Sequence, residues 1–157
     1  MKETIRNWDP DEGDLCQGDV LLFRLPKDIA PAGTDIMQTR DGKLILAEGE
    51  LTGHHHAIGF HPPMFRDDGL ARAMEAHSQP AATSARAALY RDEGVVIRLL
   101  YAGLIVDGSL CIGILVVEDA PVLLRHQEHD AVRIPPGHYY VGRQREFGAG
   151  EAYLVGD

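Results

Sequence analysis

The chain has 157 residues, of which 45% are hydrophobic. This is enough for one domain with a substantial core and too few for two ordinary domains, so we expect a single β domain over residues 1–157. The formal net charge of -9 at pH 7 argues against general binding to nucleic acid or to an anionic membrane, because both need surplus Lys and Arg.

The first residues, "MKETIRNWDPDEGD", lack the apolar core of a secretory signal, so we expect a cytoplasmic protein. Because this end is acidic and polar, residues 1–13 are expected to be flexible. Cys16 and Cys111 stand far apart without Cys-x-x-Cys spacing, which predicts two reduced thiols.

The first half of the chain predicts strands. Residues 19–26 alternate apolar side chains and end at Pro26, as a half-buried strand does. Asp41-Gly42 separates two extended runs and predicts a tight hairpin turn. That hairpin leads into "ELTGHHHAIGF", residues 50–60, which reads as a further strand.

Between residues 61 and 94 the alternation is lost, and prolines and small residues dominate. We expect an insertion, with mobile parts around residues 78–86 and a function as a lid or an interface. The piece "GLARAMEAH", residues 69–77, places apolar side chains on one face of a short helix.

Residues 95–117 contain two apolar, β-branched runs around Asp107-Gly108, which predicts a hairpin. The first run is only about twelve residues long and contains Arg98, so it is too short to span a bilayer. Because both faces of this hairpin would be apolar, we expect one face to pack against a second copy of the chain in a homo-oligomer.

Three more strands are expected over residues 122–126, 131–134 and 138–147. Some eight short strands with one short helix in an insertion predict an all-β fold, either a small barrel or a sandwich.

Three consecutive histidines, His54, His55 and His56, raise the question of a site. Because side chains alternate along a strand, His54 and His56 share one face and His55 takes the other. A His-x-His pair can share a metal ion or supply a general acid and a general base. The alternative is a polar rim in solvent.

A second group, "RHQEHDAV", contains His126, Glu128 and His129 at the end of an expected strand. Two histidine pairs beside strand ends are typical of a split metal site or a two-histidine acid-base site. We expect His54, His56, His126 and His129 to converge as ligands, with Glu128 as a base or fifth ligand. Mixed His and carboxylate ligation suits a divalent ion such as Zn, Fe, Mn or Ni.

The last expected strand carries Tyr139, Arg143 and Arg145 on one face. Guanidinium groups beside histidines suit a small anionic ligand such as phosphate or carboxylate. With Glu128, these three residues are the candidate catalytic groups. An edge strand protected by alternating charge is the alternative.

Five short motifs resemble those of small bacterial and phage-type proteins of uncharacterised function. The matching pieces are "QGDV" (17–20), "GELTGHHH" (49–56), "RHQEHDAV" (125–132) and "PPGHYYVGRQREF" (135–147), the last of which contains two of the five motifs. The chain departs from that pattern at Gln127 and Phe147, where the pattern has Glu and Tyr. The resemblance implies that both histidine motifs belong to one pattern, and a looser likeness to cupins extends to architecture alone.

Three functions follow from these patterns. The first is a small metal-dependent β protein, an enzyme whose metal site is built by the two histidine motifs. The second is a metal-free hydrolase or phosphodiesterase-like enzyme, in which two histidines move protons and Arg143 or Arg145 stabilises an anion. The third is a non-enzymatic assembly or adaptor protein with its histidines at a subunit junction.

Overall fold

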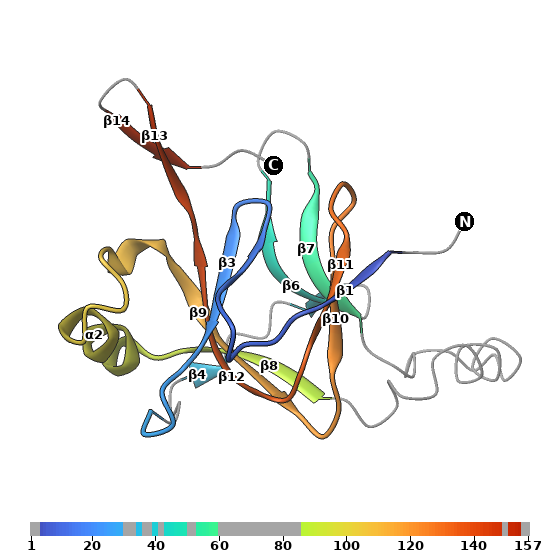
Figure 1. Ribbon diagram of the computed structural model, residues 1–157, viewed down its shortest axis with the longest axis horizontal. Helices are drawn as coiled ribbons and strands as arrows, with labels where there is room; N and C mark the ends of the chain where they lie inside the picture. The colour runs from blue at the N-terminus through green and yellow to red at the C-terminus, as the bar shows by residue number, and fades with distance from the viewer. Residues whose placement is uncertain are drawn as a thin grey trace, which may run out of the picture.

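The computed structural model describes residues 4–29, 34–35, 39–40, 43–49, 53–59, 86–148 and 151–154. The described strands form two six-stranded sheets and one separate hairpin (Figure 1). The first sheet has the order β1 (Ile5–Asn7), β11 (Ala131–Ile134), β10 (Val122–Arg125), β7 (His55–Gly59), β6 (Lys43–Glu48) and β5 (Thr39–Arg40).

The second sheet has the order β2 (Leu15–Gln17), β3 (Val20–Arg24), β12 (Gly137–Arg143), β9 (Cys111–Glu118), β8 (Arg86–Arg91) and β4 (Thr34–Asp35). A separate hairpin pairs β13 (Arg145–Gly148) with β14 (Glu151–Leu154). All pairings within the sheets are antiparallel except that of β1 with β11.

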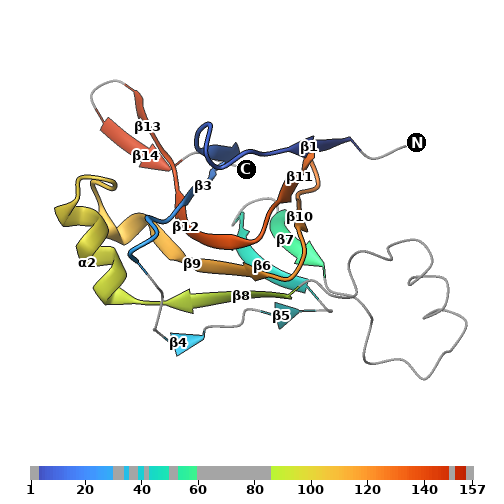
Figure 2. The ribbon, with the colours of Figure 1, turned by 60° about the horizontal axis from the view of Figure 1, so that its bottom comes forward.

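One apolar core joins the two sheets. Alternate residues of the strands point inward, so Ile58 and Leu124 of the first sheet meet Leu22 and Leu115 of the second, all fully buried. Figure 2 shows the two layers that enclose this core. The predicted all-β fold is confirmed as a sandwich, and the described strands do not close into a barrel.

Several predicted strands and turns agree with the structure. The expected strand at 19–26 is β3, and the histidine strand is β7. Arg40 pairs with Lys43 across the predicted hairpin, although Asp41 and Gly42 lie outside the described residues. The acidic N-terminal region contributes β1, which pairs in parallel with β11.

The predicted hairpin over residues 95–117 is wrong in its first half. Glu93–Tyr101 forms helix α2, and a 3-10 turn over Gly108–Leu110 precedes β9. The backbone N–H of Val95 donates to the Asp92 carboxylate at 3.2 Å, which caps the helix. Val95, Val96 and Leu99 form its buried face, so the helical spacing of the apolar side chains overrides their β-branching.

The predicted insertion is also too long at its C-terminal end. Arg86–Arg91 forms β8, which pairs with β9 and β4 inside the second sheet. The expected helix at 69–77 and the expected mobile stretch up to residue 85 lie outside the described residues. Within the part of the chain that the structure describes, no helix has the length and apolar character needed to span a membrane.

Candidate functional site

The structure brings the four predicted histidines of the two motifs together at one end of the sandwich. The ring centroid of His126 lies 4.4 Å from that of His56, 4.6 Å from that of His129 and 5.6 Å from that of His54. His126 therefore stands at the centre of the group, which we call the histidine cluster.

Strand register explains why the two motifs meet. Strands β7 and β10 are antiparallel neighbours in which Ala57 pairs with Arg125. The next positions along this pair are His56 and His126, and both side chains are buried on the core side of the sheet. Gly53 has a positive φ of 69°, and the Gly49 N–H donates to the His54 carbonyl at 2.8 Å, so the chain turns immediately before this strand.

The opposite sheet contributes two buried polar side chains that the sequence analysis did not identify as site residues. In "QGDV", Gln17 pairs with Val20, so Gly18 and Asp19 form a two-residue turn, with Gly18 at a φ of 55°. This turn directs the Gln17 and Asp19 side chains towards His56.

The orientation of the Gln17 amide follows from its contacts. Its Nε2 donates to the carbonyls of Leu124 at 3.1 Å and Asp130 at 2.9 Å. The Oε1 atom is consequently the acceptor that faces Nδ1 of His56 at 2.7 Å. Nδ1 of His56 must therefore carry a hydrogen.

The other ring nitrogen of His56 faces a carboxylate. Its Nε2 lies 3.2 Å from Oδ1 of Asp19, whose side chain is only 5% exposed. The Arg143 guanidinium bonds to the other oxygen, Oδ2, and stabilises the ionised carboxylate. Since an ionised carboxylate can only accept, Nε2 of His56 also donates, and the form that satisfies both contacts is the imidazolium.

The Asp19 turn is fixed to strand β12 as well. The Gln144 backbone N–H donates to the Asp19 carbonyl at 2.8 Å, and its side-chain amide donates to the Gly18 carbonyl at 3.1 Å. Arg143 and Gln144 belong to the "GRQ" part of the last motif. Residues from four of the sequence motifs therefore meet in one buried hydrogen-bond network.

His126 has its tautomer set by the backbone. The Glu128 N–H donates to Nδ1 of His126 at 3.0 Å. Because that nitrogen accepts, the hydrogen of the neutral ring is on Nε2. At the outer edge of the cluster, Nδ1 of His54 lies 3.6 Å from the carboxylate of Glu128, and His129 is exposed to solvent.

These hydrogen bonds bear on the predicted metal centre. A metal ligand must offer a nitrogen lone pair, whereas both nitrogens of His56 donate and the buried Nε2 of His126 holds a hydrogen. Among the described residues, no group of three or more His, Cys, Asp or Glu is arranged to hold a metal ion. The four predicted histidines do converge in one cluster.

The remaining predicted site residues take different places. Tyr139 is fully buried against Trp8, and its hydroxyl donates to the Pro135 carbonyl. Burial raises the pKa of Tyr139, so its hydroxyl holds its proton at neutral pH, which suits a structural role in the "PPG" corner. Arg143 lies in the network, and Arg145 falls in β13, where only the backbone is described.

Gln17 and Asp19 could have been found from one sequence signal. Both flank the glycine of a short turn between apolar strand residues, where a two-residue connection leaves polar side chains beside the core. Their motif, "QGDV", also belongs to the same set of motifs as the two histidine motifs. What the sequence could not give is the packing of one sheet on the other, which brings the turn against His56.

Comparison with known proteins gives a match to a family model. Residues 16–93 match a family model described as "Domain of unknown function (DUF8820)". The match supports an uncharacterised family for this part of the chain, which holds Gln17, Asp19 and the first histidine pair. No curated protein and no solved structure gives a significant match to the chain.

Proposed function

We propose that the histidine cluster is the metal-free acid-base centre of a small β-sandwich enzyme that acts on an anionic ester, with a phosphodiester as the first class to test. The observation that carries the proposal is the hydrogen-bond pattern, in which His56 donates from both nitrogens and His126 carries its hydrogen on Nε2. Two cations, His56 and Arg143, contact the one carboxylate of Asp19, and this surplus of positive charge suits an anion rather than a cation.

The two histidines at the edge of the cluster are the groups that exchange protons with substrate. His54 has 29% of its side chain exposed, and His129 is exposed, whereas His56 and His126 are buried. His54, oriented by Glu128, would take the role of base, and His129 that of acid. Arg143, which is partly exposed beside Asp19, would balance the charge that develops on the substrate oxygens.

Metal binding is the second candidate, and one observation favours it. Ring centroids separated by 4.4–5.6 Å are close enough for neighbouring imidazoles to share an ion after reorientation. Zn, Fe, Mn or Ni would suit such ligands, but His56 would first have to give up its bond to Gln17 or to Asp19. That requirement makes the metal-free centre the better supported proposal.

The test is hydrolysis of bis(p-nitrophenyl) phosphate by untagged protein in the presence of a chelator, with elemental analysis of the same sample. We expect turnover that resists chelation and falls by roughly a hundred- to ten-thousand-fold in His54→Ala and His129→Ala, because each variant removes a proton-transfer group. His138→Ala is the matched control, since His138 is exposed at the opposite end of β12 from Arg143.

Two results would overturn this proposal. Turnover that disappears on chelation and returns with one of the four metals would establish the metal-dependent centre instead. Absence of turnover with this substrate and with p-nitrophenyl phosphate would show that the protein does not hydrolyse phosphoesters.

We also propose self-association through the C-terminal half of helix α2 and the residues that follow it. All of the large hydrophobic side chains that are exposed in the described residues lie between Ile97 and Val106, and Tyr101 and Val106 are 90% and 94% exposed. This exposure supports the homo-oligomer predicted from the same stretch of sequence. In light scattering, Tyr101→Glu with Val106→Glu should lower the mass without unfolding, whereas a wild-type mass of 17.2 kDa would contradict self-association.

A further inference from the structure

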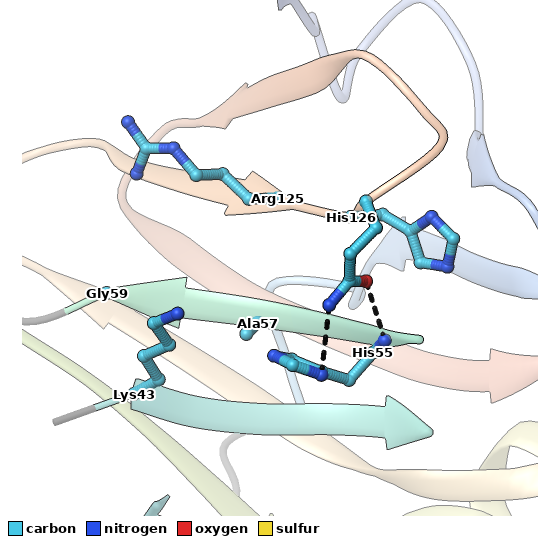
Figure 3. Close-up of a pocket in the computed structure, with 7 residues that line it drawn as sticks. Lys43, His55, Ala57, Gly59, Arg125 and His126 are labelled. Carbon is cyan, nitrogen blue, oxygen red and sulfur yellow. Dashed lines mark hydrogen bonds between the residues drawn. The ribbon is translucent and has the colours of Figure 1, made fainter. Parts of the chain in front are cut away.

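The outer side of the first sheet carries a shallow depression of about 230 Å³, whose lining includes His126 of the histidine cluster. Three neighbouring strands contribute side chains to it, namely Lys43 of β6, His55 of β7 and Arg125 of β10 (Figure 3). The imidazole of His126 points away from these three groups in Figure 3, because its ring belongs to the core side of the sheet.

Small residues leave this depression open. Ala57 and Gly59 follow His55 at every second position, so they share its outward face. Gly59 pairs with Lys43 across β6, and a Cβ built on Gly59 would meet no atom within 4 Å. The floor is therefore low, while longer side chains stand around it.

The charge of the lining is positive in a chain whose formal net charge is -9. Lys43 and Arg125 are cations, and no Asp or Glu is among the described residues that line the depression. This local sign is opposite to that of the whole molecule, so a small anion would be attracted to the depression.

Gln127 makes His55 a donor towards the depression. The His55 backbone N–H donates to Oε1 of Gln127 at 2.9 Å, which leaves the Gln127 amide nitrogen to donate to Nδ1 of His55 at 3.2 Å. Because Nδ1 accepts, the hydrogen of the neutral ring is on Nε2. Lys43, His55 and Arg125 then present only donors, without any need for His55 to be charged.

We propose that this depression binds a small tetrahedral oxyanion, namely a phosphate group, with Lys43, His55 and Arg125 as its donors. Several oxygens on one compact anion can accept from three strands at once, and guanidinium and ammonium groups form strong charge-assisted bonds with phosphate. The site is on the opposite side of the sheet from the acid-base centre and does not depend on the proposed function.

The experiment is a titration of the full-length protein with inorganic phosphate, followed by amide NMR, beside sulfate and chloride at matched ionic strength. Saturable shifts at His55, Ala57 and Gly59 in the millimolar range are expected with phosphate. Lys43→Gln and Arg125→Gln should each weaken binding about tenfold, the loss of one charged hydrogen bond. Arg86→Gln is the charge-matched control, because Arg86 is exposed on the other sheet.

A second pair of variants tests the site without removing a donor. Gly59→Asp places a carboxylate over the open floor and should abolish phosphate binding, whereas Gly59→Asn adds nearly the same volume without charge and should retain more of it. Equal shifts with chloride, or equal binding by the Asp and Asn variants, would overturn the proposal. Saturation by sulfate as well as phosphate would retain an oxyanion site and overturn its restriction to phosphate.

Discussion

The two sides of strand β7 use the same residue type in opposite ways. On the core side, His56 is 1% exposed and donates to Gln17 and Asp19. On the outer side, His55 is partly exposed and is held by Gln127 beside Lys43. Identical imidazoles therefore face two acceptors on one side of the strand and an amide donor on the other.

This difference follows from the partners that each side can supply. The core side has a carboxylate and an amide oxygen, both acceptors, so they hold a doubly protonated ring. The outer side has the amide NH₂ of Gln127, a donor, which holds a ring with an unprotonated Nδ1. Neighbouring polar groups, rather than strand position alone, set the chemistry of each histidine.

The largest expected effect is a loss of unfolding free energy when the buried carboxylate on the core side is removed. Asp19→Ala would leave His56 and Arg143 without their carboxylate, and removing one partner of a buried ion pair costs about 3–5 kcal/mol. Asp11→Ala is the matched control, since it removes an exposed pair with Arg24 and should cost less than about 1 kcal/mol. The free energies of unfolding come from urea denaturation.

Equal losses in the two aspartate variants would show that Asp19 is not in a buried network. A larger loss for Asp11→Ala would contradict the account outright, because that carboxylate is 75% exposed.

A smaller contrast is expected between two adjacent histidines. His56→Ala leaves Oε1 of Gln17 buried without its donor and should lower the free energy of unfolding by about 2–3 kcal/mol. His55→Ala removes one partly exposed contact with Gln127 and should cost less than about 1 kcal/mol. Thermal and urea unfolding of both variants compare the two losses of unfolding free energy. A larger loss for His55→Ala than for His56→Ala would contradict the assignment of His56 to the buried face.

The sequence predicted which histidines share one face of the strand. It did not predict which of their ring nitrogens carry hydrogens. Alternation along a strand separates His55 from His54 and His56, and that separation needs only the local period. The donors and acceptors around His56 come from Gln17, Asp19 and Arg143, which are distant in sequence. Their meeting depends on two sheets packing together, which no local pattern reports.

The predicted strand in the α2 region was wrong because the local pattern itself was ambiguous. Residues 95–106 are apolar at nearly every position, so a strand and a buried helix fit the pattern equally well. The Asp92 cap and Gly103, at a φ of 73° near the end of the helix, are the signals that favour a helix. The Asp107-Gly108 pair, interpreted as a hairpin turn, instead begins a 3-10 turn.

The smallest expected effect concerns metal removal. On the proposal of a metal-free centre, a chelator should change the melting temperature by less than about 1 °C, because no ion would contribute to the folded state. Differential scanning calorimetry with and without chelator measures this shift. A marked fall that zinc reverses would place an ion on the core side of β7.

Ring-nitrogen NMR of the histidines tests the central claim most directly. His56 should show hydrogens on both nitrogens at neutral pH, whereas the neutral rings of His55 and His126 should each show an unprotonated Nδ1 and a protonated Nε2. These states follow from the groups that face each ring nitrogen. An unprotonated nitrogen on His56 whose signal shifts on addition of zinc would contradict the account and favour a metal centre.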